Sequence, residues 1–220
     1  MSFGKIAGKV AILLAGGATV AGIGYVTYNY LKLRKDAQED EGFEELSKTI
    51  EESKEKRVLV LGLDNAGKSA VLACMENNEL QSAPKPTEGF NVMCVQKNDT
   101  TLNIWEIGGD PSVRKYWHNF IQDTDILVFV VDSADTKRHP EAYDELHIQL
   151  GDERLKHVPI VIVANKQDLA GALKPHEIQT VLGLDFFSPK DHKVQVIGTE
   201  TPLEGIKKGH EHLENLLMKL

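Results

Sequence analysis

Short apolar runs alternate with amphipathic stretches of helical length from residue 57 onward. The runs Val58–Leu61, Ile126–Val131 and Pro159–Val163 are almost wholly apolar, as strands buried on both faces of a sheet require. Asn91–Val95 and Thr101–Ile107 alternate instead, and the Lys-Asn-Asp-Thr between them predicts a hairpin. The pattern therefore predicts a sheet with both kinds of strand.

Five segments have the apolar spacing of helices: Lys68–Asn77, Arg114–Gln122, His139–Leu150, Pro175–Gly183 and Gly205–Leu220. Strand, helix and strand in succession imply right-handed crossovers between parallel strands. We therefore expect an α/β domain over residues 57–220, with an open and mostly parallel sheet. Ligands of such sheets bind beyond the C-terminal ends of the strands.

The stretch 10–31 contains no charged residue, and lysine or arginine flanks both of its ends. At helical rise it is about 33 Å long, enough to cross the hydrocarbon core of a bilayer. We expect a transmembrane helix at 10–31 after a short N-terminal segment, 1–9. A cleaved secretory signal, whose apolar region is usually shorter, and a buried soluble helix are the alternatives.

Residues 32–56 form an acidic linker without proline. Phe43, Leu46 and Ile50 recur at spacings of three and four, so this linker is either a short amphipathic helix or a solvated charged segment. The basic cluster Lys32, Arg34 and Lys35 favours a cytosolic position for everything that follows it. We expect a single-pass membrane protein of the endoplasmic reticulum and endomembranes or of the mitochondrial outer membrane.

Composition excludes some classes of function. The formal net charge of −8 argues against nucleic acid as a partner, because neutralising phosphates requires a basic surface. The two cysteines, Cys74 and Cys94, provide neither a disulfide framework nor a metal-type spacing. We expect both to be buried, reduced thiols, as in a cytosolic environment.

The segment Gly-Leu-Asp-Asn-Ala-Gly-Lys-Ser directly follows the first apolar run. Two glycines that flank four residues, followed by Lys-Ser, are typical of a loop that cradles phosphates with successive backbone N–H groups at a helix N-terminus. Lys68 is the expected catalytic lysine that reaches the outer phosphates, and the Ser69 hydroxyl is an expected Mg²⁺ ligand. The nucleotide-contacting residues expected here are Gly62, Leu63, Asp64, Asn65, Ala66, Gly67, Lys68 and Ser69.

Asn165, Lys166, Gln167 and Asp168 follow the apolar strand Pro159–Val163. A carboxylate at Asp168 can accept hydrogen bonds from the ring N–H and the exocyclic amine of guanine, and adenine offers no such pair. Asn165 would tie this loop to the phosphate loop, and the stem of Lys166 would lie over the base. Alone the four residues could form a polar turn, but after a phosphate loop they predict guanine recognition. An ATP-dependent kinase or ATPase is correspondingly disfavoured.

Two further motifs lie between these loops: Pro86-Thr-Glu-Gly-Phe-Asn91 and Trp105-Glu-Ile-Gly-Gly109. With them, residues 57–220 resemble a small GTPase of the ADP-ribosylation-factor-like family, within the Ras superfamily. Together with the apolar N-terminal stretch, the Glu-Ile-Gly-Gly variant is similar to divergent, membrane-anchored members of that family. The resemblance implies a phosphate-loop GTPase domain with a six-stranded, mostly parallel sheet flanked by helices, and GTP, GDP and Mg²⁺ as its cofactors.

The resemblance also assigns roles by position. Thr87 would bind Mg²⁺ and sense the γ-phosphate, and the Gly109 N–H would bind the same phosphate. The aromatic residues Phe90, Trp105 and Phe120 match positions that dock effectors, although core packing explains them equally well. Further nucleotide-contacting residues implied by the resemblance are Trp105, Glu106, Ile107, Gly108 and Thr199, the last in a poorly matched loop at Gly198-Thr-Glu200.

The chain departs from the family pattern at the catalytic position. Asp110 stands where the family has a glutamine, and Pro111 follows it. The shorter, negatively charged side chain would lie near the γ-phosphate, where the reaction needs cations. We therefore expect slow GTP hydrolysis. Two functions follow: a GTP/GDP switch that recruits effectors, or an interaction scaffold that holds GTP almost permanently.

A second departure concerns membrane attachment. Ser2 replaces the glycine that typical family members use for myristoylation. A spanning helix would instead hold the chain on the membrane in both nucleotide states. The expected partners are therefore the membrane, through the N-terminal helix, and effector proteins together with exchange and activating factors.

Overall fold

The computed structural model describes residues 54–77, 85–186, 193–203 and 205–220. The chain divides into two compact units, Met1–Lys54 and Glu55–Leu220. Apart from Lys54, all described residues belong to the second unit. The predicted segments 1–9 and 10–31, and all but the end of the linker at 32–56, lie outside the described residues.

Six strands form one sheet in the order β2-β3-β1-β4-β5-β6. β1 is parallel to β4, β4 to β5 and β5 to β6, whereas β2 and β3 are antiparallel. The predicted α/β fold with a mostly parallel sheet is therefore confirmed. The strands are β1 Lys54–Leu61, β2 Phe90–Lys97, β3 Thr100–Ile107, β4 Ile126–Asp132, β5 Ile160–Asn165 and β6 Val194–Gly198.

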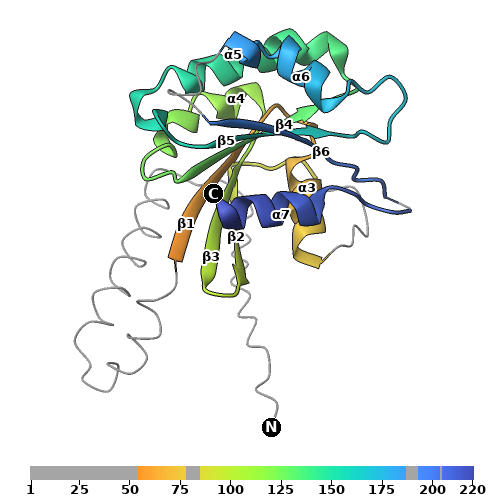
Figure 1. The fold of residues 1–220 in the computed structure, drawn as a ribbon. Coiled ribbons are helices and arrows are strands. Elements are labelled where there is room, and N and C mark those ends of the chain that lie inside the picture. The colour runs from red at the N-terminus through yellow and green to blue at the C-terminus, as the bar shows by residue number, and fades with distance from the viewer. Residues whose placement is uncertain (1–53, 78–84, 187–192, 204) are drawn as a thin grey trace, which may run out of the picture. The chain divides into compact units, whose positions relative to one another are not determined.

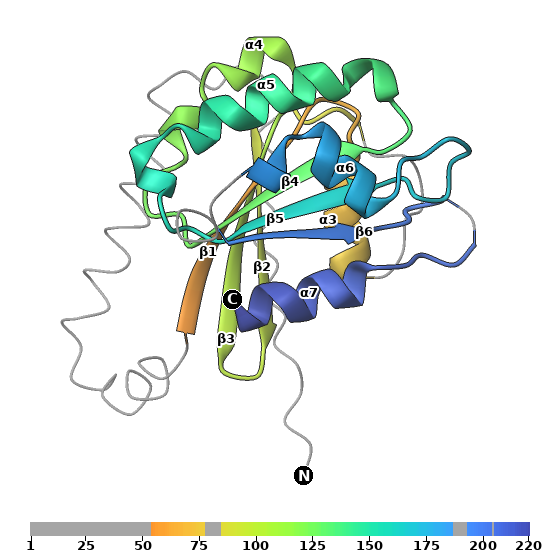
Figure 2. The ribbon, with the colours of Figure 1, turned by 45° about the horizontal axis from the view of Figure 1, so that its top comes forward.

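Helices cover both faces of this sheet. α5 and α6 lie on one face and α3 and α7 on the other (Figures 1 and 2). The α-helices are α3 Lys68–Asn77, α4 Pro111–Arg114, α5 His139–Leu150, α6 Pro175–Val181 and α7 His210–Lys219. Short 3-10 helices are η2 Trp117–Asn119, η3 Thr136–Arg138, η4 Glu153–Leu155 and η5 Leu184–Phe186.

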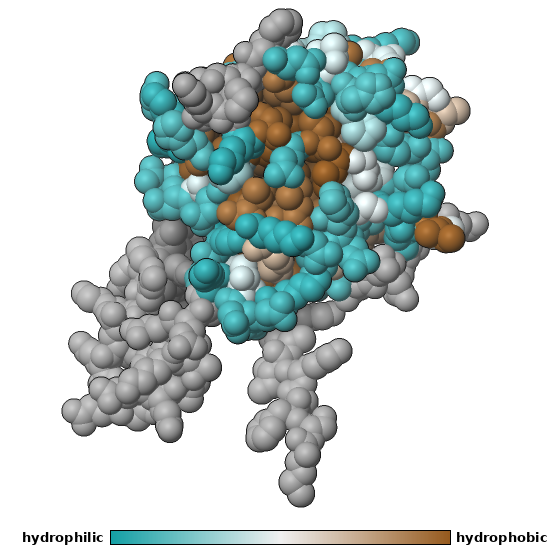
Figure 3. Space-filling model, viewed as in Figure 1, coloured by the Kyte–Doolittle hydropathy of each residue, from teal (hydrophilic) through white to brown (hydrophobic). Residues whose placement is uncertain are grey.

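The core has two halves because successive side chains of a strand point to opposite faces of the sheet. In β1, Leu59 and Leu61 belong to the cluster that packs under α5 and α6, whereas Val58 and Val60 belong to the cluster under α3 and α7. Figure 3 shows apolar side chains along the strands between these helical layers, with hydrophilic residues around them. Continuous apolar runs were therefore the right sequence signal for the central strands.

The predicted helix Arg114–Gln122 is wrong. In its place α4 ends at Arg114, and η2 holds Trp117 with its side chain fully buried. The Trp117 indole N–H donates to the Gly108 carbonyl at 2.9 Å, which draws the chain inward and replaces continuous helix with i to i+3 turns. Cys94 is also exposed rather than buried, because β2 lies at one end of the sheet.

The membrane localisation expected from the sequence is corrected. Within residues 54–77, 85–186, 193–203 and 205–220, no helix combines the length and the apolar character needed to cross a bilayer. The apolar stretch 10–31 lies outside the described residues. The expected transmembrane helix, and the endoplasmic reticulum or mitochondrial membrane location built on it, are therefore not carried forward.

His210, the first residue of α7, is a buried polar residue. Its side chain is 4% exposed, and neither ring nitrogen has a hydrogen-bond partner among the described residues. Burial, with a smaller effect of the Lys207 charge, lowers the pKa of His210. A buried imidazole without hydrogen bonds costs stability that an apolar side chain would not.

We predict that His210→Leu raises the free energy of unfolding by about 1–2 kcal/mol at neutral pH. Below about pH 6.5 the unfolded chain binds a proton that folded His210 resists, so the wild type loses further stability and the variant does not share this loss. Urea denaturation at pH 7.5 and 5.5 measures both effects. His176→Leu, at an exposed position, is the control, and a His210 variant less stable than wild type at both pH values would contradict the prediction.

Candidate functional site

The loop between β1 and α3 has a backbone shape that requires its two glycines. Gly62 has φ +141° and Gly67 has φ +90°, in the region that side chains rarely adopt. A Cβ on Gly62 would lie 2.2 Å from the Val130 carbonyl oxygen, and one on Gly67 would lie 2.3 Å from Asn165 Nδ2. The loop therefore packs directly on β4 and on the end of β5, which bring the predicted guanine motif beside it.

Lys68 lies across this loop. Its Nζ donates to the carbonyl oxygens of Gly62 at 2.8 Å and Leu63 at 3.0 Å, and the residue is 6% exposed. Burial lowers the pKa of Lys68 to about 8, although the nearby Glu106 carboxylate opposes this effect. A cation kept in a dry loop is suited to an anionic ligand, which would stabilise its charged form.

Three oxygen donors meet at the start of α3. Ser69 Oγ donates to Glu106 Oε1 at 2.5 Å, and Thr87 Oγ1 lies 3.1 Å from each of these two oxygens. Asn91 Nδ2 donates to the other Glu106 oxygen at 3.0 Å, which orients the carboxylate. Hydroxyl and carboxylate oxygens are the donors that Mg²⁺ prefers, so this set fits that ion.

The Gly108-Gly109 segment after β3 lies on the phosphate loop. The Asp64 N–H donates to the Gly109 carbonyl at 3.1 Å. A Cβ on Gly109 would lie 2.4 Å from backbone atoms of Gly62, Leu63 and Asp64. The structure therefore brings the second predicted phosphate-sensing residue against the loop, in a space that admits only glycine.

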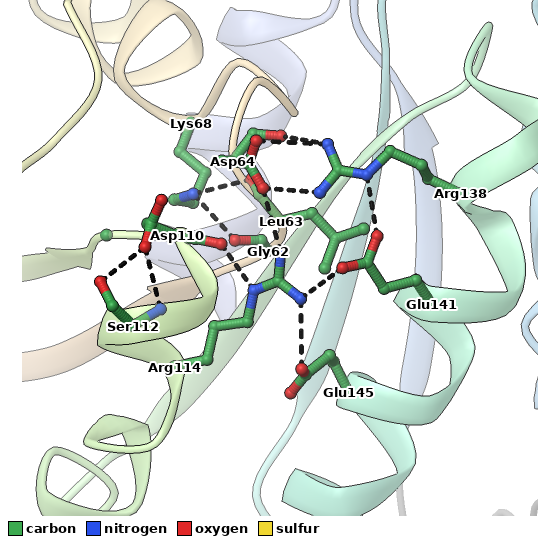
Figure 4. Close-up of polar contacts among 12 residues, drawn as sticks. Gly62, Leu63, Asp64, Lys68, Asp110, Ser112, Arg114, Arg138, Glu141 and Glu145 are labelled. Carbon is green, nitrogen blue, oxygen red and sulfur yellow. Dashed lines mark hydrogen bonds and ion pairs between the residues drawn. The ribbon is translucent and has the colours of Figure 1, made fainter.

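Asp110, which the resemblance noted above aligns with a catalytic glutamine, serves as the N-cap of α4. Its Oδ1 accepts hydrogen bonds from the Ser112 N–H at 2.9 Å and the Ser112 hydroxyl at 2.6 Å (Figure 4). These hydrogen bonds hold the pKa of Asp110 below its ordinary value. The carboxylate is thus engaged with its own helix, with Pro111 in the first helical turn.

The phosphate loop is also bound by a charge cluster that the sequence motifs did not reveal: Asp64, Arg114, Arg138, Glu141 and Glu145. Figure 4 shows the guanidinium groups of Arg114, at the end of α4, and Arg138, at the end of η3, converging on Asp64, with Glu141 of α5 between the two arginines and Glu145 beside Arg114. The three carboxylates and two guanidiniums are joined by contacts of 2.6 to 3.2 Å. Only the pair Arg138 and Glu141 has a spacing, three residues, at which a helical ion pair is readable from the sequence, and that spacing does not reveal Asp64 or Arg114 as partners.

Asn165 makes the predicted link between the two loops. Its Nδ2 donates to the Ala66 carbonyl at 3.0 Å. Its Oδ1 accepts from the hydroxyls of Thr199 at 2.9 Å and Thr201 at 3.2 Å. Because Asn165 and Thr199 are buried, this amide, with partners on both its nitrogen and its oxygen, fixes the phosphate loop to the ends of β5 and β6.

The remaining residues of the predicted guanine motif, 166–168, form a rim that is open to solvent at Asp168. Lys166 Nζ pairs with Asp132 Oδ2 at 2.7 Å, and Gln167 Nε2 donates to Ser133 Oγ at 2.8 Å. Asp168 is exposed at the end of this turn. Its carboxylate is thus accessible to a ligand, beside a loop that is itself held in place.

The three aromatic candidates form one cluster away from these polar groups. The ring centroids of Phe90 and Phe120 lie 5.6 Å and 6.5 Å from that of Trp105, and 5.7 Å from each other. All three residues are partly buried against the core under α5. The Arg57 guanidinium lies 4.8 Å from the Trp105 ring centroid. Ile107, expected among the nucleotide contacts, is buried in the same core.

Comparison with known proteins agrees with this arrangement. The model of the ADP-ribosylation factor family matches residues 43–217. The chain is 41% identical to ADP-ribosylation factor-like protein 3 of Chlamydomonas reinhardtii over 71% of this chain and 88% of that protein. It is 44% identical to ADP-ribosylation factor-like protein 2 of Drosophila melanogaster over 64% of this chain and 76% of that protein.

A solved structure resembles the fold as well. It is the Arl6 BBS3 small GTPase from Trypanosoma brucei with the bound nucleotide analogue GppNp. The match has a TM-score of 0.66 and 26% identity, and it covers 76% of this chain and 96% of that chain.

We predict that Gly109→Ala lowers the free energy of unfolding by about 2 kcal/mol or more, because the added methyl meets backbone atoms that cannot rotate away. Gly151→Ala is the matched control, since its Cβ would lie 3.5 Å from the nearest atom; we expect a change within about 0.5 kcal/mol. Urea denaturation of the full chain measures both. Equal stabilities for the two variants would contradict the close approach of Gly109 to the loop.

Proposed function

This chain belongs to the ADP-ribosylation factor family and is a small GTPase, and we propose that it works as a switch between GTP-bound and GDP-bound forms. The observation that carries the proposal is the joining of three predicted elements around one loop: Lys68, the oxygen donors near Ser69, and Asn165.

In the proposed complex the phosphates bind to the loop of residues 62–69, at the N-terminus of α3. Lys68 and the helix dipole compensate their charge. Ser69 and Thr87 hold Mg²⁺, which would neutralise phosphate oxygens when bound. Glu106 already lies beside both hydroxyls and would support that site.

Base recognition is assigned to the rim formed by residues 165–168. The exposed Asp168 carboxylate accepts hydrogen bonds from guanine, and the amide of Asn165 keeps this rim at a fixed distance from the phosphates. An adenine would leave the carboxylate without a donor. The nucleotide analogue bound to the related Trypanosoma brucei GTPase supports a nucleoside triphosphate as the ligand.

We propose that effector proteins bind the surface that the GTP-bound form presents. Phe90, Trp105 and Phe120 lie on β2, on β3 and just after η2, so their cluster joins the two segments that carry Thr87 and Gly109. An ordering of these segments by GTP would therefore change the surface around the aromatic rings. Exchange and activating proteins are expected as further partners of the same segments.

Slow hydrolysis is the second part of the proposal. Asp110 is engaged in capping α4, and a carboxylate in place of a neutral amide cannot orient water with a donor group and also repels the γ-phosphate. This observation favours a second candidate function, in which the chain holds GTP almost permanently and serves as an interaction scaffold. Nucleotide content after purification, together with the turnover rate, separates the two.

We predict that Asp110→Gln raises the single-turnover rate of GTP hydrolysis about tenfold, because an amide can orient the attacking water. Asp110→Asn is the matched control: it removes the charge and keeps an N-cap side chain, but it is too short to reach the water. We expect its rate to stay near that of the wild type. Equal rates for the Gln variant and the wild type would contradict a hydrolytic defect at this position.

A further inference from the structure

The two peptide groups on either side of Gly109 are each held by a buried side chain. The Trp117 indole N–H donates to the Gly108 carbonyl at 2.9 Å. Arg114 Nε donates to the Gly109 carbonyl at 2.6 Å. Both side chains are buried, with Arg114 6% exposed, so water does not compete for these hydrogen bonds.

Because the peptide group is planar, these hydrogen bonds also fix the orientation of the Gly109 N–H. That N–H and the Gly108 carbonyl belong to one planar, trans unit and point in opposite directions. The hydrogen bond from Trp117 therefore orients the N–H. The next peptide is fixed from the other side, because the Gly109 carbonyl accepts from both Arg114 and the Asp64 N–H.

We propose that Arg114 is a positioning residue that makes the protein select a nucleoside triphosphate over a diphosphate. It does so by holding the Gly109 backbone on the phosphate loop, with its N–H ready for the third phosphate. This inference rests on the proposed nucleotide-binding function, in which only the triphosphate reaches Gly109. A preoriented donor costs no reorganisation when the ligand binds.

Arg114 can do this because each part of its guanidinium has a defined partner. Nη1 donates to Glu141 at 2.7 Å and Glu145 at 3.2 Å, and Nη2 donates to Asp64 at 3.0 Å. The partners come from α5 and from the phosphate loop, so the loop and the segment after β3 are fixed to one rigid helix. A buried guanidinium needs this full pairing.

The same cluster also neutralises the negative charge of Asp64, which would be unfavourable beside bound phosphates. Asp64 is a carboxylate within a segment that must accept phosphates. Arg138 Nη2 binds it at 2.6 Å, and Arg138 Nη1 also donates to the Asp64 carbonyl at 3.1 Å. Burial alone would raise the pKa of Asp64, but Arg138 and then Arg114 keep it below its ordinary value. The carboxylate is thus compensated and held on the α5 side.

The experiment compares affinities of the full chain for a slowly hydrolysed GTP analogue and for GDP, with Mg²⁺ present, by displacement of a fluorescent GDP. In Arg114→Ala we expect the preference for the triphosphate, expressed as the ratio of the two affinities, to fall about tenfold, as the loss of one charge-assisted hydrogen bond would give. The affinity for GDP should remain within about twofold. General damage would instead lower both affinities together.

Glu141→Gln is the milder second variant, because it keeps the side-chain shape and removes a charge that Arg114 and Arg138 share. We expect a fall of about threefold in the same ratio. Arg154→Ala is the control, since Arg154 bonds to Asp152 and the His118 carbonyl, outside the cluster. If Arg114→Ala does not fold, the Glu141 variant decides.

An unchanged ratio in a folded Arg114→Ala and in Glu141→Gln, or an equal loss of both affinities, would overturn the positioning role. A wild-type chain that binds neither nucleotide would instead refute the proposed function itself. The two failures are therefore distinguishable by the wild-type measurement alone.

Discussion

The site depends on the close approach of two stretches of backbone, at Gly109 and at the phosphate loop. The hydrogen bond from the Asp64 N–H to the Gly109 carbonyl measures 3.1 Å, and the space beside it excludes even a methyl group. Contact at this distance requires glycine on one side and a loop with positive φ angles on the other. Because the Gly109 backbone lies directly against the phosphate loop, a phosphate bound to that loop would also lie within reach of the Gly109 peptide group.

Two further sets of contacts keep this arrangement rigid. Asn165 fastens the phosphate loop to the ends of β5 and β6, and Arg114 fastens the segment after β3 to α5. In both buried side chains every nitrogen and oxygen atom has a hydrogen-bond partner, and such satisfied polar groups rigidify a structure. The two loops are therefore fixed to the sheet and to α5 as well as to each other.

The amino-acid sequence predicted the framework well because its signals are local. Buried strands read as apolar runs, and Lys68–Asn77 and His139–Leu150 have the predicted helix bounds. The phosphate loop and the Asn165 motif were also recognisable, since each needs fixed residue types at fixed spacing. What the sequence missed is long-range: Trp117 breaks the predicted helix to reach Gly108, and the partners of Arg114 lie up to 50 residues away. No local pattern encodes such pairings.

GTP, with its guanine beside Asp168 and its phosphates beside Lys68, is the proposed ligand of this loop. Isothermal titration of the nucleotide-stripped full chain with GTP and with ATP, both with Mg²⁺, tests it most directly. We expect GTP to bind at least about 100-fold more tightly than ATP, because adenine would cover the Asp168 carboxylate without offering it a hydrogen-bond donor. Equal affinities, or no binding of GTP to a chain that circular dichroism shows to be folded, would contradict it.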